Sequence, residues 1–454
     1  AAKAARPTMK VVVIDPRRTA TSDIADLHLA VRADGDIALF NGLLAYLAET
    51  GAIDENYVGK HTSGFGETLL AASRGSMADL SDATGVSGML LRQFFRLFAQ
   101  TEKVVTCYSQ GVNQSSVGTD KVNAILNCHL ATGRIGRPGM GPLSLTGQPN
   151  AMGGREVGGL ANMLAAHMAI ENPEHLERVQ RFWKSPAIAE RPGLKAVDMF
   201  EAVADGRIKA IWIMSTNPVV SMPDADAVKA ALEACPFVVV SDIQKHTDTV
   251  RLAHVLLPAS GWGEKSGTVT NSERRISRQR PFLSVPGEAR ADWWQLAEVG
   301  KRLGFGPGFD FRDPADIYAE HAALSAFEND GERDFDIGAH AEIDAEAYDT
   351  LAPFQWPLRQ DRSSTARFFA DGGFFTADRK ARFVPVASPA PEEADECRPF
   401  TLNTGRIRDH WHTMTRTGKS ARLSAHIAEP FCEIHPADAE KAGIGDADLV
   451  DVEG

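Results

Sequence analysis

Several features that mark other protein classes are missing from this 454-residue sequence. No stretch reaches the roughly 18 consecutive apolar residues of a membrane-spanning helix. Only five cysteines are present, at positions 107, 128, 235, 397 and 432, and no two have Cys-x-x-Cys spacing. This usage argues against a disulfide framework and favours a reducing compartment. It also excludes a zinc or iron–sulfur site built from local ligand spacing.

The common nucleotide-binding signatures are missing as well. No Gly-x-Gly-x-x-Gly motif follows the predicted strands that end in aspartate, and no Walker-type loop is present, so ordinary NAD or ATP binding is disfavoured. A net charge of −12 argues against general binding to nucleic acid or to an anionic membrane. The sequence is 43% hydrophobic and 24% charged, as in ordinary globular proteins, and its length suits about three domains.

Strand and helix patterns alternate in two parts of the sequence. In the first part, strands are predicted over 11–14 and 103–107, and helices over 39–47, 91–98 and 119–130, with Asp36 as a helix cap and Gly133 as a helix stop. In the second part, strands are predicted over 208–214 and 237–240, with a helix over 228–235. This alternation predicts an α/β fold with two doubly wound, mostly parallel units.

The remaining segments have other compositions. Nine acidic residues and a single Arg333 between positions 328 and 349 predict a solvated insertion. From position 400, strands predicted over 431–434 and 449–452 and a short helix after His435-Pro436 indicate the start of a β-rich domain. Because the sequence begins without methionine and stops directly after a strand pattern, we expect an internal piece of a longer polypeptide.

Asp15 and Asp242 each end a predicted strand in one of the two α/β units. Ligands of open parallel sheets bind at the carboxyl ends of strands, where an aspartate can accept two hydrogen bonds from a guanine edge or a ribose. The alternative is an ordinary turn or cap aspartate. His129, on an apolar helix face, is expected to be a core residue.

Three further segments are candidates for binding. Residues 133–159 contain 9 glycines and 3 prolines in 27 residues, which allows close backbone approach to a ligand, and arginines there can neutralise an anion; a structural Ω-loop is the alternative. Residues 264–275 offer a lysine and a glycine for a phosphate, or an exposed hairpin. Residues 404–413 group Arg, His and Trp around a glycine turn, which suits anion or stacking contacts better than a metal.

Taken in order, these motifs resemble the molybdopterin oxidoreductase superfamily over nearly the whole sequence. The motifs that carry the resemblance are Ile14–Thr19, Gly111-Val112-Asn113-Gln114, the loop 133–159, Ser241-Asp242, Glu264–Gly267, Ala291-Asp292-Trp293, and Thr404-Gly405-Arg406 followed by His410-Trp411-His412. Within the superfamily, Leu145–Asn150 with Arg155-Glu156 resembles the nitrate reductase branch, closest to bacterial assimilatory catalytic subunits.

The resemblance implies a bis-molybdopterin guanine dinucleotide cofactor with molybdenum, bound between the two α/β units. One nucleotide would be held by Asp15, Pro16, Arg17, Arg18, Thr19, Asp34, Gly35 and Asp36, and the other by Asn217, Ser241, Asp242, Lys265 and Asp292. Gln110 and Gln114 lie where the family contacts a pterin. Thr404, Gly405, Arg406, His410, Trp411, His412 and Thr413 would close over the cofactor. Arg155 is the candidate catalytic residue, a cation that attracts nitrate or stabilises charge during oxygen transfer.

The same resemblance sets the expected domains. These are a first nucleotide-binding unit over 1–132, the cofactor loop 133–159, a second nucleotide-binding unit over 160–325, an acidic insertion and linker over 326–395, and part of a molybdopterin-dinucleotide-binding β-barrel over 396–454.

In this family a cysteine ligates molybdenum and a 4Fe-4S cluster precedes the first strand. Neither is in this sequence, so no metal ligand is expected in it, and this polypeptide alone is expected to be inactive. The intact protein would reduce nitrate to nitrite in the cytoplasm, during nitrate assimilation. Its electrons would come from an NADH-dependent reductase subunit, ferredoxin or flavodoxin, and no nucleic acid or membrane partner is expected. The alternatives are a formate dehydrogenase of the same superfamily and a non-catalytic scaffold subunit of an electron-transfer complex.

Overall fold

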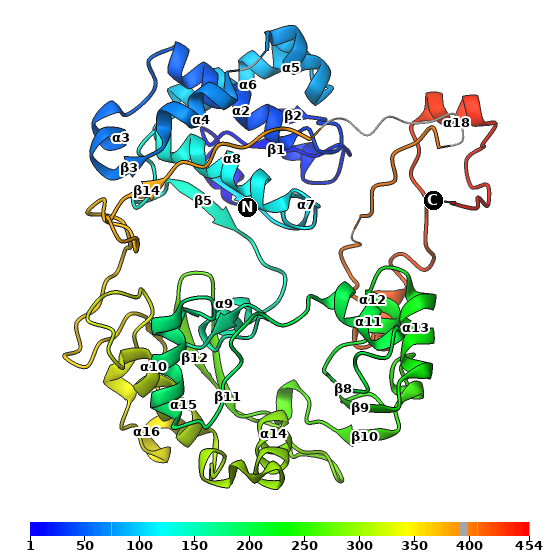
Figure 1. Ribbon diagram of the computed structural model, residues 1–454. Helices are drawn as coiled ribbons and strands as arrows, with labels where there is room; N and C mark the ends of the chain where they lie inside the picture. The colour runs from blue at the N-terminus through cyan, green and yellow to red at the C-terminus, as the bar shows by residue number, and fades with distance from the viewer. Residues whose placement is uncertain (74, 390–397, 406, 454) are drawn as a thin grey trace. The chain divides into compact units, whose positions relative to one another are not determined.

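The computed structural model describes residues 1–73, 75–389, 398–405 and 407–453, which form two compact units (Figure 1). Unit 1 comprises Ala1–Pro192, Gly267–Gln279 and Phe311–Glu393. Unit 2 comprises Gly193–Ser266, Arg280–Asp310 and Ala394–Gly454. Within the described residues no helix combines the length and apolar character needed to cross a membrane.

The amino-terminal part of unit 1 is built on two parallel strand pairs. β1 (Val12–Ile14) pairs with β2 (Leu27–Leu29), and β4 (Val105–Tyr108) pairs with β5 (Gly141–Ser144). The helices are α1 (Ala2–Ala5), α2 (Asp36–Glu49), α3 (Glu55–His61), α4 (Phe65–Ala72), α5 (Met77–Thr84), α6 (Gly88–Gln100), α7 (Gln110–Asn113) and α8 (Gly118–Ala131). The predicted strands and helices of this part are therefore present. Asp36 is the first residue of α2 and its side chain does not cap the helix.

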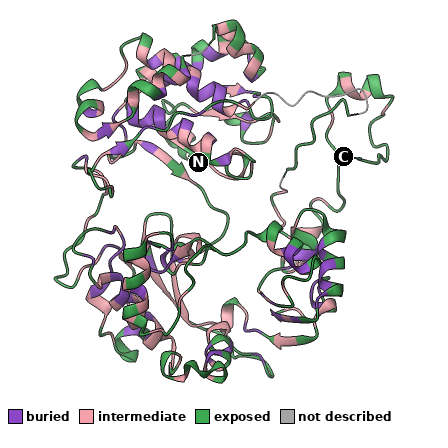
Figure 2. Ribbon diagram, viewed as in Figure 1, coloured by how far each residue is buried: buried purple, intermediate pink, exposed green. Residues whose placement is uncertain are grey.

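The first core of unit 1 lies along α2, α6 and α8, whose buried faces are purple in Figure 2. Leucines and phenylalanines at helical spacing fill it, among them the fully buried Leu43, Leu47, Leu91 and Phe95. A much later segment completes this core. β14 (Ala381–Arg382) pairs with β3 (Thr62–Ser63), and Asn41 and Asn127 donate hydrogen bonds to the carbonyls of Val386 and Val384 at 3.0 and 2.8 Å.

A second core of unit 1 joins segments that are distant in sequence. It packs α10 (Pro173–Trp183) and α15 (Pro314–Ala326) with the antiparallel strands β11 (Gly267–Thr270), β12 (Arg275–Gln279) and β13 (Phe354–Gln355). The other elements of this part are α9 (Ala151–Glu156), β6 (Met163–Leu164), β7 (Met168–Ala169) and α16 (Ala345–Asp349). β11 and β12 form an antiparallel hairpin, as in the alternative given for 264–275, while Lys265 lies before the first of these strands.

The acidic segment 328–349 is not simply a solvated insertion, and that prediction was wrong. Phe335 and Ile337 are fully buried in the second core, and Tyr348 is nearly so. Arg333 is also buried, where it donates to the carbonyls of Ser325 and Phe327. Asp336, between Phe335 and Ile337, is buried as well, and its Oδ1 accepts the N–H of Gly338 at 2.8 Å, so the acidic count hid a buried segment.

Unit 2 contains a three-stranded parallel sheet in the order β10-β9-β8, formed by Val255–Pro258, Phe237–Asp242 and Ala210–Met214. Its helices are α11 (Ala196–Ala204), α12 (Pro218–Ser221), α13 (Ala225–Ala234) and α14 (Asp292–Gly300). Val238 and Val240 of the central strand are fully buried against Leu232 of α13. A fully buried apolar strand of this kind is typical of parallel sheets covered by helices, which confirms the predicted α/β class.

The described residues of 398–453 contain two short α-helices, α17 (Ala421–Ser424) and α18 (Pro436–Ala442), a 3₁₀ helix at Thr417–Lys419, and no strand. α18 confirms the helix predicted after His435-Pro436. The strands predicted over 431–434 and 449–452 are not formed, nor is any part of a closed barrel among the described residues. A strand is stable only when a neighbour accepts its backbone hydrogen bonds, and no described segment pairs with these two.

Candidate functional site

In unit 1 the first group of predicted site residues lies where β1 ends. Asp15 follows β1 directly, and its Oδ1 accepts a hydrogen bond from the backbone N–H of Arg17 at 2.8 Å. The carbonyl of Asp15 lies 2.9 Å from Nε2 of His28 on β2. Pro16 and Arg18 are exposed and Thr19 is half-buried. The strand therefore ends in a compact turn whose polar groups face solvent at the carboxyl edge of the β1–β2 pair.

The turn Asp34-Gly35-Asp36 follows β2 and leads into α2, and a buried lysine holds it. Nζ of Lys121 on α8 lies 2.7 Å from Asp34 Oδ1 and 3.0 Å from Asp36 Oδ2. The hydrogen bond from Lys121 holds the pKa of Asp34 below its usual value, although partial burial opposes this. Two strand-end carboxylates thus share one ammonium group.

The segment with Gln110 and Gln114 reaches the same turn. Gln110 begins α7 and Gln114 follows it, and the hydroxyl of Ser115 donates to Asp34 Oδ1 at 3.3 Å. The structure therefore brings the 34–36 turn and the segment after β4 to neighbouring positions in unit 1, while Asp15 contacts Arg17 and His28 at the end of the β1–β2 pair.

The corresponding edge of unit 2 carries Asn217, Ser241 and Asp242. Asn217 is buried after β8, where its Oδ1 accepts from the hydroxyl of Thr249 at 2.7 Å. Ser241 is also buried; its hydroxyl donates to Gln295 at 2.7 Å and accepts from Trp212 Nε1 at 2.8 Å. These two side chains are thus engaged in internal hydrogen bonds. Asp242 ends β9, half-buried, and its Oδ1 accepts from the N–H of Gln244 at 2.9 Å.

Lys265 and Asp292 meet at the same edge. Ser260, after β10, donates its N–H to the carbonyl of Arg290 at 3.1 Å, which brings the start of α14 beside the loop that carries Lys265. Lys265 Nζ lies 2.5 Å from Asp292 Oδ2. The other carboxylate oxygen, Asp292 Oδ1, is buried and has no hydrogen-bond partner among the described residues. An unpartnered buried acceptor of this kind is costly unless a ligand satisfies it.

The glycine-rich segment 133–159 is partly ordered into β5 and the short helix α9, which carries Arg155 on its exposed side. Both ends of α9 are fixed to strand β11. Asn150 Oδ1 accepts the N–H of Thr270 at 2.8 Å, and Glu156 Oε2 accepts its hydroxyl at 2.8 Å. Glu156 Oε1 also accepts from Nε1 of the buried Trp356 at 2.7 Å. Arg155 therefore lies on the exposed side of a helix whose two ends are held by hydrogen bonds to β11.

Glu156 is only 3% exposed, and burial raises the pKa of its carboxyl group above the usual value. The two hydrogen bonds from Thr270 and Trp356, together with the charge of His167, act in the opposite direction. His167 itself lies 2.7 Å from Asp334. On the exposed side of α9, the positive charge of Arg155 partly offsets the increase that burial produces in the pKa of Tyr108. Arg155 thus acts electrostatically at the carboxyl end of β4.

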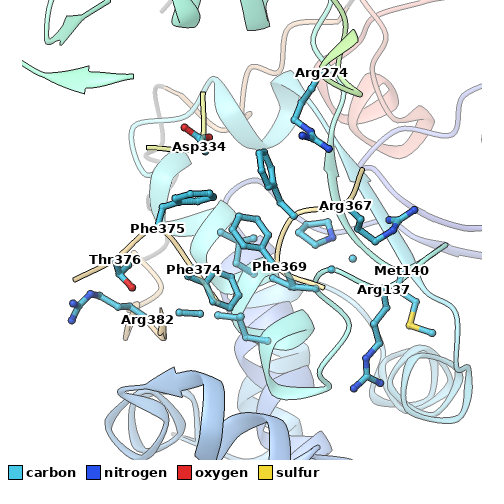
Figure 3. A pocket seen from close by; sticks show the side chains of 18 of the residues that line it. Arg137, Met140, Arg274, Asp334, Arg367, Phe369, Phe374, Phe375, Thr376 and Arg382 are labelled. Atoms are coloured by element: carbon cyan, nitrogen blue, oxygen red, sulfur yellow. The ribbon is translucent and has the colours of Figure 1, made fainter. Parts of the chain in front are cut away.

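A cavity of about 890 Å³ in unit 1 lies beside these elements (Figure 3). The glycine-rich segment contributes Arg137 and Met140, and a later segment contributes Arg367, Phe369 and neighbouring aromatic residues. Figure 3 shows these phenylalanine rings gathered between arginine side chains. None of the predicted site residues lines this cavity.

The carboxy-terminal candidates lie in irregular structure. Nδ1 of His410 and the N–H of Trp411 both lie 3.2 Å from the hydroxyl of Thr417, and the rings of Trp411 and His412 meet edge to face at 4.5 Å. Thr404 and Gly405 are exposed and Thr413 is half-buried. Arg406 lies outside the described residues.

Lys121 was missed by the sequence argument although a signal for it exists. It occupies the buried face of a helix beside Ala124 and Ile125, and a charged residue on such a face needs a partner. His129 was expected to be a core residue, and it is fully buried 2.8 Å from the hydroxyl of Thr106.

Known proteins match these features along the sequence. The family profile described as molybdopterin oxidoreductase matches residues 1–302, and that described as molydopterin dinucleotide binding domain matches residues 400–454. The chain is 52% identical to a nitrate reductase from Klebsiella oxytoca, over 99% of this chain and 51% of that protein. It is 35% identical to the assimilatory nitrate reductase catalytic subunit of Bacillus subtilis, over 97% of this chain and 62% of that protein. Formate dehydrogenase subunits match at 30–32% identity.

Among solved structures, acetylene hydratase from Pelobacter acetylenicus has a similar fold, with a TM-score of 0.69 and 16% identity, over 98% of this chain and 63% of that one. The chain spans about half the length of the curated relatives that it matches at 50% identity or more.

Proposed function

The chain belongs to the molybdopterin oxidoreductase family, and from this premise we propose that the protein containing it reduces nitrate to nitrite. The 52% identity to a nitrate reductase, maintained over 99% of the chain, is the observation that carries the proposal. The formate dehydrogenases are more distant, at 32% identity or less. Nitrate loses one oxygen atom and takes up two electrons and two protons, which gives nitrite and water.

The residues at the two sheet edges suit a cofactor with two guanine nucleotides. Guanine presents N–H donors along one edge, and a carboxylate can accept two of them. In unit 2 the buried Asp292 Oδ1 is an acceptor without a partner among the described residues, while Lys265 fixes the other oxygen. Asp15, Asp34, Asp36 and Asp242 supply further carboxylates, of which those of Asp34 and Asp36 also contact Lys121. We therefore assign the nucleotide arms to these edges and the pterin contacts to Gln110 and Gln114.

When bound, the molybdenum cofactor supplies the two-electron centre that accepts the oxygen atom. The contribution of this chain is to bind, orient and neutralise charge. Thr404, Gly405, Arg406 and His410–Thr413 are proposed as further contacts to the cofactor, on the pattern of the family profile that matches 400–454.

Arg155 is the proposed catalytic residue for nitrate. Its guanidinium is exposed, and its helix is anchored by Asn150 and Glu156. A fixed cation attracts the anion and stabilises negative charge that develops on the departing nitrite, and removing one such donor typically costs about 100-fold or more in turnover.

The test is the purified full-length enzyme with Arg155→Ala. We expect nitrate turnover with reduced viologen to fall about 100-fold, with unchanged molybdenum and guanine nucleotide content. Arg137→Ala is the matched control, because Arg137 lies in the same segment but is paired with Asp54 at 3.2 Å. Unchanged nitrate kinetics in Arg155→Ala would exclude this role. If the wild-type enzyme oxidised formate with an oxidised dye and left nitrate untouched, the proposed function itself would be wrong.

We propose that electrons reach the enzyme from an NADH-dependent reductase subunit, ferredoxin or flavodoxin. A cytoplasmic location follows from the assimilatory resemblance. Reconstitution with each donor in turn tests the first point, and cell fractionation tests the second.

A further inference from the structure

Lys121 is a buried cation that the proposed function does not use. Its side chain is 4% exposed, and α8 delivers it to the turn between β2 and α2. The two carboxylates it contacts differ in exposure: the side chain of Asp34 is 50% exposed and that of Asp36 is 16% exposed. The ammonium group is thus inside the protein, whereas one of its partners still faces solvent.

The turn that Lys121 holds is also bonded to a segment that is assigned to a different part of the cofactor. Asp34 and Asp36 belong to the nucleotide turn. Ser115, which also bonds Asp34 Oδ1 at 3.3 Å, follows the segment with the pterin-contact residues. Asp34 adopts a left-handed backbone conformation with φ of +59°, which is uncommon for a residue other than glycine and needs support from its surroundings.

A structural role alone does not account for a lysine here. Burying an ammonium group is expensive, and apolar residues of similar size often stabilise a core equally well. An ion pair does something that an apolar contact does not, since it fixes particular oxygen atoms in position and orients their remaining lone pairs. It also leaves the pair of carboxylates with one net negative charge, enough to accept hydrogen bonds from a guanine edge.

We propose that Lys121 is a positioning residue for cofactor binding. It ties the 34–36 turn to α8, which directly follows the 110–117 segment, so that the nucleotide and pterin contacts are held in register. This inference rests on the cofactor of the proposed function. It does not depend on nitrate being the substrate.

The experiment compares cofactor content in full-length protein purified from a host that makes the cofactor. Guanine nucleotide released by acid and molybdenum are both measured per protein, with far-ultraviolet circular dichroism as the readout of folding. Lys121→Met removes the ammonium group. Lys121→Met/Asp34→Asn removes the link but restores the original net charge. Asp34→Asn alone keeps the contact of Lys121 with Asp36 and measures the direct contribution of the Asp34 carboxylate, so we expect it to lose less cofactor than the double variant. Lys60→Met, at an exposed position on α3, is the control for the loss of a lysine.

We expect both Lys121 variants to lose cofactor about tenfold or more, in line with the coupling between linked binding elements, and Lys60→Met to resemble the wild type. The double variant is expected to keep the wild-type circular dichroism spectrum.

Cofactor content at the wild-type level in the folded double variant would overturn the proposal, because charge balance alone would then suffice. Wild-type protein that contains no guanine nucleotide would also overturn it. Wild-type protein that holds the cofactor but does not reduce nitrate would contradict the proposed function and leave the role of Lys121 testable by the same measurements.

Discussion

The anchor beneath α9 gives a prediction whose size and pH dependence both follow from the structure. Thr270→Val replaces the buried hydroxyl that donates to Glu156 with a methyl group of almost the same shape. Glu156 then keeps the bond from Trp356 and loses the one from the Thr270 hydroxyl, while the Thr270 N–H still bonds Asn150. A hydrogen bond to a charged group contributes about 1.5–3 kcal/mol, and one to a neutral group about 0.5–1.5 kcal/mol.

The penalty depends on pH because burial raises the pKa of Glu156. A carboxyl group whose pKa is higher in the folded state binds a proton more tightly there, so its contribution to stability is greatest in acid and declines as the pH rises through the folded pKa. Losing the Thr270 donor raises that pKa further. We therefore expect Thr270→Val to cost about 2 kcal/mol at pH 7.5 and clearly less at pH 4.5.

Differential scanning calorimetry of the purified protein at the two pH values is the measurement. At neutral pH the transition that includes unit 1 should fall by about 4 °C. Thr268→Val is the control, since Thr268 lies on the same strand, half-buried, and its hydroxyl makes no hydrogen bond within the part of the chain that the structure describes. Equal melting temperatures for the two variants at pH 7.5 would refute the idea that this hydroxyl holds the carboxylate.

Two further predictions concern stability. Gly136→Ala should destabilise the protein by more than about 1 kcal/mol in urea unfolding, because φ is +79° and a Cβ there would lie 2.4 Å from the carbonyl of Phe369. Gly139→Ala, with φ of +72° but only an ordinary contact to Lys103 Cδ at 3.8 Å, should cost less, and equal losses would contradict this. Burial lowers the pKa of His321 to about 4, so the unfolded state binds a proton at higher pH than the folded state does. The free energy of unfolding therefore falls as the pH drops from about 6.5 toward 4. His321→Leu should reduce the change in the urea midpoint between pH 7 and pH 5, and a midpoint that changes as much as in the wild type would contradict this.

The elements that the sequence predicted well are those whose pattern is local. The β-branched run of β1 and the leucine spacing of α2 need no information from elsewhere, because one buried face determines the structure. The strands expected over 431–434 and 449–452 depend on partners, which a local pattern does not supply. In the acidic segment, Phe335 and Ile337 were the signal of burial that the charge count concealed, and Asp336 is buried between them.

The site could be predicted in part for the same reason. Strand-end aspartates such as Asp15 and Asp242 can be recognised from the strand that precedes them. Their stabilising partners are remote in sequence. Trp356 reaches Glu156 across 200 residues, and six helices, α2 to α7, separate Lys121 from Asp34 in the sequence. Tertiary packing determines such pairs. The sequence therefore indicates only that a buried charged or polar residue needs a partner, and does not identify that partner.

The pairing of β14 with β3, and the two asparagine bonds beside it, mean that the first core of unit 1 is finished by a segment made late. A ribosome that adds roughly 5–20 residues per second takes about 10–50 s to travel from the end of α8 to β14. During that interval the three strands of unit 2 have already emerged. The amino-terminal part of unit 1 is therefore synthesised first but completes its core only after unit 2 strands have been made. Until β14 is synthesised, some 250 codons downstream, part of the apolar surface of this core stays uncovered.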